Sequence, residues 1–206
     1  MTREVLIAPG LWMPSVAMTL FAARLTRAGY TPRVFSYRGR SSLEANRERF
    51  ARFAREALGG RPAHFVGHSL GGVLVLEMLN AHADIPVATA VLLGPPARGC
   101  LAGRRFGAGS VGRWMMGACG ELWQDHCAVW KREAPLGVIA GTLPLGLGRI
   151  IGGRLPGAND GVVRVEETAV NGMAAQALVP TGHSLLIVSA AVERLAEHFM
   201  RTGRFE

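Results

Sequence analysis

The sequence predicts an α/β fold in which about six mostly parallel strands form one sheet with helices on both faces. Short apolar runs of strand length alternate along the chain with longer segments of helical periodicity, and this alternation is typical of parallel sheets. A glycine-bracketed turn, Gly67-His68-Ser69-Leu70-Gly71, separates one such run from an apolar helical segment. With 206 residues, 49% of them apolar, the chain can form one packed core, so we expect a single domain over residues 1–206.

The first half of the chain is predicted to supply two strand–helix units. A proline in the first turn and Gly29 just past the end bound the first helix, as is usual for helices. The pattern Ser41-x-x-Glu44 indicates a capping box at the start of the second helix. In order, we expect a strand at 5–8, a helix at 14–28, a strand at 33–37 and a helix at 41–58.

The second half continues this pattern and departs from it twice. We expect strands at 63–66, 89–93, 137–141 and 177–179, a helix directly after the glycine-bracketed turn, and a last helix at 189–201. Residues 98–130, rich in Arg, Trp and Met, and the Gly-rich residues 143–160 both follow the carboxyl ends of strands. Ligands bind at that edge in open α/β sheets. We therefore expect both segments to serve function, with residues 98–130 as a small cap or lid-like excursion.

Composition narrows the choice of partners. The formal charge is +8, carried by 22 Arg and a single Lys, and it is compatible with weak association with an anionic membrane surface. The arginines are scattered and accompany no nucleic-acid-binding motif, so we expect no nucleic-acid partner. No apolar run reaches the length of a membrane span and no signal peptide is visible, so we expect a cytoplasmic location. Nothing in the composition indicates the oligomeric state.

The cysteines give no sign of a metal site. Cys100, Cys119 and Cys127 are odd in number and match no metal-ligand spacing. We expect them to be reduced and mostly buried. Neither a metal nor an organic cofactor is expected.

Ser69 is the candidate nucleophile, because its setting between a strand and a helix is that of a nucleophile elbow. Gly67 and Gly71 stand where a Cβ would clash in so tight a turn, and the serine lies near the positive end of the following helix. A serine hydroxyl becomes reactive only when a histidine accepts its proton, an acid orients that histidine, and N–H groups bind the oxyanion.

The chain order Ser, acid, His that accompanies such an elbow restricts the choice of acid. Asp160 lies in an Asn-Asp-Gly turn after the fifth predicted strand, from which a carboxylate can reach the next loop, and it is the predicted acid. Asp84 closes the helix after the elbow and is expected at the wrong edge of the sheet, as a solvated turn residue. Asp125, beside His126, remains a rival, and Glu166 and Glu167 remain fallback acids.

His183 is the predicted base, because it follows the sixth strand in a loop that faces the elbow. His126 remains the alternative base. The other four histidines are assigned no catalytic role: His64 as a satisfied strand residue, His68 with its side chain pointing away from Ser69, and His82 and His198 as solvated residues at helix ends.

Two backbone N–H groups are expected to bind the oxyanion. One belongs to Leu70, directly after the nucleophile, and the other to Leu11, in the loop after the first strand. Five large apolar side chains either line a groove for the acyl chain or belong to the core, and the sequence leaves both readings open: Trp12, Met13, Trp114, Met115 and Met116.

Together these motifs resemble those of the α/β-hydrolase superfamily, in particular small bacterial lipase- or esterase-like proteins related to GPI inositol-deacylases. The resemblance implies a minimal α/β-hydrolase fold. Because the family's Asp before Gly-Val-Val and its last-loop His complete the triad, it also implies Ser69, Asp160 and His183. It covers most of the chain and rests on the segments Ala8–Trp12, Val66–Gly72, Leu93–Pro96, Asn159–Val163 and Gly182–Ser184.

Two positions depart from that family's pattern. Its His-Gly after the first strand is Pro9-Gly10 here, which keeps the backbone donor and removes a polar group near the oxyanion. Its Gly-Thr-Pro after the fourth strand is Gly94-Pro95-Pro96, which changes the polarity near the elbow. The expected activity is hydrolysis of lipid or short acyl esters through an acyl-enzyme. The alternatives are a thioesterase or acyltransferase with the same triad, or a catalytically silent module that binds a membrane or a protein.

Overall fold

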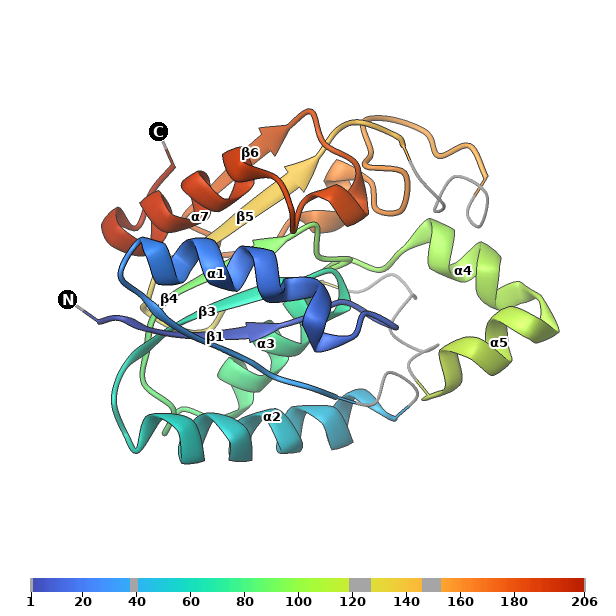
Figure 1. Ribbon diagram of the computed structural model, residues 1–206. Helices are drawn as coiled ribbons and strands as arrows, with labels where there is room; N and C mark the ends of the chain where they lie inside the picture. The colour runs from blue at the N-terminus through green and yellow to red at the C-terminus, as the bar shows by residue number, and fades with distance from the viewer. Residues whose placement is uncertain (1, 38–40, 119–126, 146–152, 206) are drawn as a thin grey trace.

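A computed structural model of the chain describes residues 2–37, 41–118, 127–145 and 153–205, and it has the expected α/β architecture (Figure 1). The six strands of its sheet all pair in parallel, in the order β2-β1-β3-β4-β5-β6. Their bounds are β1 Glu4–Ala8, β2 Thr31–Val34, β3 Ala63–His68, β4 Val87–Leu93, β5 Leu136–Gly141 and β6 Ala175–Val179. The fold class expected from the sequence is confirmed.

Helices cover both faces of the sheet, with α1 and α7 on one face and α2 and α3 on the other (Figure 1). Successive strand residues point to opposite faces, so Leu6 and Phe65 join the core beneath α2 and α3. Val5, Ile7 and Val66 join the core beneath α1 and α7. The helices are η1 Ser15–Met18, α1 Thr19–Arg27, α2 Leu43–Leu58, α3 Leu70–Ala81, α4 Leu101–Ala108, α5 Ser110–Met116, η3 Val165–Thr168, η4 His183–Leu185 and α7 Ala190–Thr202.

Two local expectations are corrected. The second strand is β2 over Thr31–Val34 rather than 33–37, because its pairing with β1 begins at Thr31 opposite Glu4. The cap of α2 is Ser42 rather than the residue before it, since the Ser42 hydroxyl accepts a hydrogen bond from the Ala45 N–H at 3.2 Å. Both are shifts of one to three residues that leave the order of elements unchanged.

The helices α4 and α5 form a hairpin beyond the carboxyl edge of the sheet (Figure 1). They belong to residues 98–130, and their buried side chains share a core cluster with the first turn of α3, composed of Leu70, Val73, Cys100, Ala102, Met116, Leu155 and Val163. This hairpin therefore packs directly beside Ser69, although its action as a cap stays a prediction.

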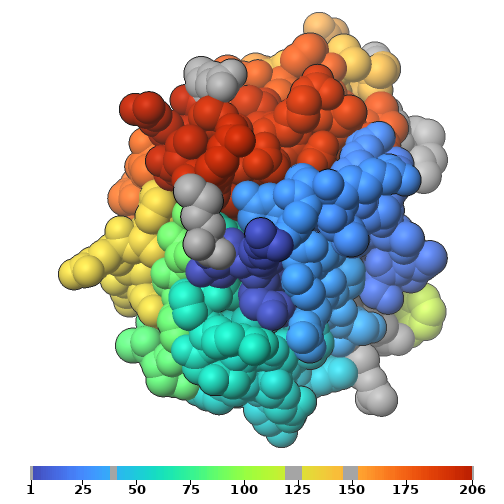
Figure 2. Space-filling model, turned by 60° about the vertical axis from the view of Figure 1, so that its left-hand side comes forward, coloured from blue at the N-terminus to red at the C-terminus, as the bar shows by residue number. Residues whose placement is uncertain are grey.

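Both ends of the described chain lie at the opposite edge, where the strands begin (Figure 1). Figure 2 shows this end, where α7 and α2 lie to either side of the first residues of β1. Within the four described ranges, no helix combines the length and the apolar character needed to cross a membrane.

The two described cysteines are free thiols in different surroundings. Cys100 is buried as expected, and burial raises the pKa of its thiol to about 12. Cys127 is exposed, so the expectation that it is buried is wrong; its sulfur accepts a hydrogen bond from the Asn171 side chain at 3.1 Å on the protein surface. Cys119 lies outside the described residues.

Candidate active site

Ser69 occupies a strained turn between β3 and α3. Its backbone has φ 54° and ψ −127°, and the only other non-glycine residue with positive φ in the described ranges is Trp12. The turn is held by the Ser69 N–H, which donates to the Leu93 carbonyl at 2.9 Å, and by the Ser69 carbonyl, which accepts from the Gly72 N–H at 2.8 Å. Strain of this kind in a non-glycine residue concentrates at functional sites.

The two glycines that bracket the turn are required by space. A Cβ on Gly67 would lie 2.5 Å from the Gly71 carbonyl oxygen, and a Cβ on Gly71 would lie 2.2 Å from the Ala8 carbonyl oxygen. Because both obstacles are backbone atoms, no side chain can move aside to make room. The close approach predicted for this turn is thus present.

Asp160 and His183 form a buried acid–base pair. The Nδ1 atom of His183 lies 2.7 Å from Oδ2 of Asp160, and the His183 N–H also donates to the Asp160 carbonyl at 2.9 Å. The other carboxylate oxygen accepts from the N–H groups of Val162 at 3.0 Å and Val163 at 2.8 Å. Because a carboxylate oxygen only accepts hydrogen bonds, Nδ1 of His183 must carry the hydrogen of this contact. The Nε2 atom of His183 then keeps a lone pair and can act as a base.

Three other segments, distant from one another in the chain, meet near this pair. A Cβ on Gly94 would lie 3.1 Å from Oδ2 of Asp160, and one on Gly10 would lie 3.2 Å from the Ser69 Cβ. The ring of His68, next to Ser69, has its centroid 4.9 Å from that of the His183 ring. Among the hydrogen bonds of the described residues, none joins Ser69 to His183. Such bonds often form only when substrate is bound.

The loop after β1 lies against the elbow. The Met13 N–H donates to the Gly10 carbonyl at 3.2 Å, and the Tyr37 hydroxyl donates to the Pro9 carbonyl at 2.9 Å. Within the described parts of the chain, no hydrogen bond uses the Leu11 N–H. Leu70 is the first residue of α3, so its N–H has no carbonyl partner one turn earlier.

The five apolar residues expected near the site divide between surface and core. Trp12 and Trp114 are exposed, and the Trp12 indole donates to the Met115 carbonyl at 3.1 Å. Met116 is buried in the cluster below the α4–α5 hairpin, and Met13 packs against the core of α1 and α7. Met115 is partly buried, so its exposure is intermediate between that of the two tryptophans and that of Met116.

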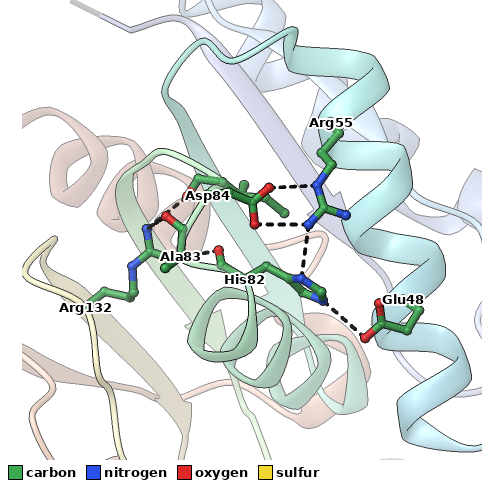
Figure 3. Close-up of polar contacts among 7 residues, drawn as sticks. Glu48, Arg55, His82, Ala83, Asp84 and Arg132 are labelled. Atoms are coloured by element: carbon green, nitrogen blue, oxygen red, sulfur yellow. Dashed lines mark hydrogen bonds and ion pairs between the residues drawn. The ribbon is translucent and has the colours of Figure 1, made fainter.

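The rival acids that can be located are engaged elsewhere. Asp84 lies beyond the end of α3, at the edge of the sheet away from Ser69, and Figure 3 shows its carboxylate on the Arg55 guanidinium, at 2.7 Å and 3.0 Å. Its expected place at the wrong edge and its expected character as a solvated turn residue are both confirmed, since its side chain is 57% exposed while it pairs with Arg55. Glu167 is buried and accepts hydrogen bonds from the N–H groups of Leu101 and Arg164.

The other histidines also have partners. His64 is buried, with Nδ1 2.8 Å from the Thr89 hydroxyl, as expected for a satisfied strand residue. His82, expected to be solvated, instead lies between Arg55 and Glu48, at 3.1 Å and 3.2 Å (Figure 3). Asp125 and His126, the remaining rivals, lie outside the described residues.

Two roles in this site escaped sequence reasoning: those of Tyr37 and His68. Each acts through a contact with a residue far away in the chain, so no local pattern signals it.

A cavity of about 520 Å³ also lies beside the acid loop, with Pro144, Leu155 and Asn159 in its lining. In the parts of the chain that can be described, no group of three or more His, Cys, Asp or Glu side chains is arranged to hold a metal ion.

The model of the alpha/beta hydrolase family matches residues 5–198 of this chain. Among solved structures, one of a putative alpha/beta-superfamily hydrolase from Xanthomonas campestris is 14% identical, with TM-score 0.60, and covers 97% of this chain and 98% of that one. A lipase from Bacillus licheniformis in its propeptide form is 18% identical, with TM-score 0.75, and covers all of this chain but only 51% of the lipase.

A thioesterase of prodiginine biosynthesis from Streptomyces coelicolor is 15% identical, with TM-score 0.62, and covers 96% of this chain and 84% of that one. At these identities the likeness concerns the fold alone. No curated protein matches the chain significantly.

Proposed function

Because the chain belongs to the alpha/beta hydrolase family, we propose that it is a serine hydrolase that cleaves carboxylic esters through an acyl-enzyme. The observation that carries the proposal is the buried contact between His183 Nδ1 and Asp160 Oδ2 at 2.7 Å, beside a serine in a strained elbow. A buried carboxylate that orients an imidazole near a serine is the arrangement of a Ser-His-Asp triad, and a strained turn between strand and helix exposes the serine hydroxyl.

In the proposed reaction, Ser69 attacks the ester carbonyl while Nε2 of His183 accepts the hydroxyl proton. Asp160 keeps the imidazole in the Nδ1–H tautomer and stabilises its cationic form. The N–H groups of Leu11 and Leu70 bind the oxyanion of the tetrahedral intermediate. His183 then returns the proton to the leaving alcohol, and a water molecule activated by the same histidine releases the acid and restores Ser69.

The proposed substrate is an ester with an apolar acyl chain, in a lipid or a small molecule. Most large exposed apolar side chains of the described chain belong to the segments that follow the carboxyl ends of β1, β4, β5 and β6: Trp12, Val16, Leu20, Val111, Trp114, Leu143, Leu145, Leu185 and Val188. We call these residues the apolar rim. Exposed apolar patches of this kind mark binding surfaces.

The proposal extends to weak association of this rim with an anionic lipid surface. Residues 98–118, which include the α4–α5 hairpin, carry four arginines and no acidic residue. Exposed Trp and Val together with Arg favour the boundary between lipid headgroups and acyl chains.

Hydrolysis of a thioester is the second candidate, and the likeness to the Streptomyces coelicolor thioesterase supports it. The same three side chains would act on a thioester without change, since only the leaving group differs. Comparison of p-nitrophenyl esters of increasing chain length with acyl thioesters of matching length distinguishes the two substrates.

The test of the proposed function is covalent labelling with a fluorophosphonate together with ester hydrolysis. Wild-type protein is expected to be labelled and active, and Ser69→Ala to lose both properties. Ser184→Ala is the matched control, because Ser184 is an exposed serine next to His183 and its loss should change neither. Labelling that persists in Ser69→Ala would refute Ser69 as the nucleophile. Wild-type protein that is neither labelled nor active toward any activated ester would refute the proposal and favour a silent binding module.

A further inference from the structure

His68 is a buried titratable residue of the site that the proposed reaction does not use. It is the last residue of β3 and directly precedes Ser69. Only 1% of its surface is exposed, and its Nε2 lies 3.1 Å from the His183 carbonyl oxygen. Its Nδ1 is buried without any hydrogen-bond partner, close to the backbone of Gly10. The sequence assigned this side chain no catalytic role, and these contacts place it against the loop of His183.

The contacts of the ring fix its tautomer. A carbonyl oxygen only accepts hydrogen bonds, so Nε2 of His68 must carry the hydrogen and Nδ1 must carry a lone pair. Protonation of Nδ1 would place a second N–H against Gly10, where a Cβ would already lie 3.0 Å from that nitrogen. The bond to the His183 carbonyl is the one polar interaction left to the side chain in the described structure.

Electrostatics favour the same neutral form. Burial, and after it the nearby positive charge of His183, lower the pKa of His68 to about 3, against the smaller opposing effects of its hydrogen bond to the His183 carbonyl and of the Asp160 carboxylate. A neutral His68 leaves His183 as the only imidazole of the pair that becomes a cation during the proposed reaction. A second cation so close would oppose proton transfer from Ser69 to the base.

The His183 backbone is thereby held from two sides. Its N–H donates to the Asp160 carbonyl, and its carbonyl accepts from the Leu186 N–H at 3.3 Å within η4. The second lone pair of that carbonyl receives the His68 N–H. Because His68 and Ser69 are adjacent in the chain, this bond joins the nucleophile elbow directly to the loop that carries the base.

We infer that His68 is a positioning residue, whose Nε2–H, held in the neutral tautomer, fixes the His183 loop relative to Ser69. The inference rests on the proposed function, since the distance that it sets is that between the proposed nucleophile and base. Misplacement of reacting groups by about 1 Å can cost about 100-fold in rate, so one hydrogen bond here affects catalysis beyond its effect on folding.

Two substitutions separate the donor from the volume of the ring. His68→Gln keeps an amide N–H at the reach of Nε2, whereas His68→Met has a similar length and no donor. We expect His68→Met to lower kcat by about 10- to 100-fold with little change in KM, and His68→Gln to restore most of the loss. His64→Gln is the matched control: this buried histidine of the same strand lies at the far end of β3 and should affect stability without changing kcat.

A measurement that does not depend on turnover keeps the two proposals distinguishable. In Ser69→Ala protein, ¹⁵N NMR should find His68 as the Nε2–H tautomer, without titration between about pH 5 and pH 8. The His183 Nδ1–H resonance should persist in His68→Gln and broaden or vanish in His68→Met. A His68 that titrates in this range, a Nδ1–H tautomer, or equal kcat and equal His183 spectra in both variants would overturn the inference. An inert wild-type protein with the expected spectra would instead refute the proposed function alone.

Discussion

Asp160 is the polar residue with the most closely determined surroundings in the candidate site. It is fully buried, and both of its carboxylate oxygens accept hydrogen bonds, two from backbone N–H groups and one from His183. An asparagine would fill the same space. If its amide nitrogen took the place of Oδ2, it would turn a donor toward His183 and favour the tautomer with the hydrogen on Nε2, which cannot accept a proton from Ser69.

We therefore predict that Asp160→Asn lowers kcat by about 10⁴-fold while the fold is retained. The check is steady-state hydrolysis of a p-nitrophenyl ester together with thermal unfolding followed by circular dichroism. Asp84→Asn is the control, because Asp84 binds Arg55 far from the site and its loss should leave kcat unchanged. A loss of less than about tenfold in folded Asp160→Asn would show that another acid orients the base.

The sequence indicated the acid and the base through chain order and turn composition, and the structure does bring Asp160 and His183 together. It did not indicate the roles of His68 or Tyr37. The His68 bond spans 115 positions of the chain and the Tyr37 bond spans 28. Such contacts depend on how loops from different strands meet, and no local composition or spacing records them.

At the scale of an element, the β3–α3 elbow depends on backbone proximity. A Cβ on Gly71 would lie 2.2 Å and 2.3 Å from the carbonyl oxygens of Ala8 and Pro9, at the end of β1. The elbow and the oxyanion loop therefore cannot both keep their places if residue 71 has a side chain. A side chain at residue 71 would therefore both destabilise the turn and displace the oxyanion loop from Ser69.

We predict that Gly71→Ala lowers the midpoint of thermal unfolding by several degrees or prevents folding, as expected for a severe backbone clash. Any folded fraction should lose fluorophosphonate labelling. Gly109→Ala is the matched control, because Gly109 has φ −84° and its nearest obstacle to a Cβ is 3.9 Å away. If the two variants unfold at the same temperature and label alike, the turn accommodates a side chain at residue 71.

Elements with regular periodicity were predictable, and those that depend on distant packing were less so. The strand–helix units from β1 to α3 and the last helix followed their apolar patterns. The α4–α5 hairpin gave no such pattern, because glycines and arginines interrupt its apolar stripe, and its buried residues face α3 and the acid loop rather than the sheet. Its helices are formed by tertiary packing more than by intrinsic propensity.

At the scale of the whole molecule, buried histidines make stability depend on pH. Burial lowers the pKa of His64, and burial together with the charge of His183 lowers that of His68 to about 3 from an ordinary 6.5. Below about pH 6.5 these two histidines bind protons in the unfolded chain but stay neutral in the folded protein. Their contribution to the free energy of unfolding is thus complete above that pH and is lost as the pH falls toward the folded values.

We predict that the free energy of unfolding decreases from pH 7 to pH 5 by up to about 1.4 kcal/mol per pH unit for each such histidine. Urea unfolding at several pH values measures the slope. Carboxylates add their own acid dependence, so the informative quantity is the difference from His68→Gln, which should have a shallower slope. Equal slopes in the two proteins would mean that His68 is protonated in the folded state.

The distribution of apolar and basic groups over the whole molecule favours one face for a lipid surface. The apolar rim lies on segments that leave the same edge of the sheet as the candidate site, and the α4–α5 hairpin among them is basic. Attraction between its arginines and anionic headgroups would be screened by salt over a Debye length of about 10 Å at 0.1 M. Apolar contacts of Val111 and Trp114 would remain, so both kinds of interaction should be separable by salt.

We predict that Ser69→Ala protein, which leaves lipid intact, cosediments with vesicles that contain phosphatidylglycerol and much less with pure phosphatidylcholine. Raising the salt from 0.1 M to 1 M should weaken the binding, because it shortens the Debye length to about 3 Å. A further Val111→Ser should lower the partition coefficient by about tenfold, as the loss of one buried apolar side chain implies. Leu178→Ser is the matched control, because Leu178 is also apolar and more than half exposed but lies on β6 outside the rim. Equal losses in the two variants would assign binding to general hydrophobicity rather than to this face.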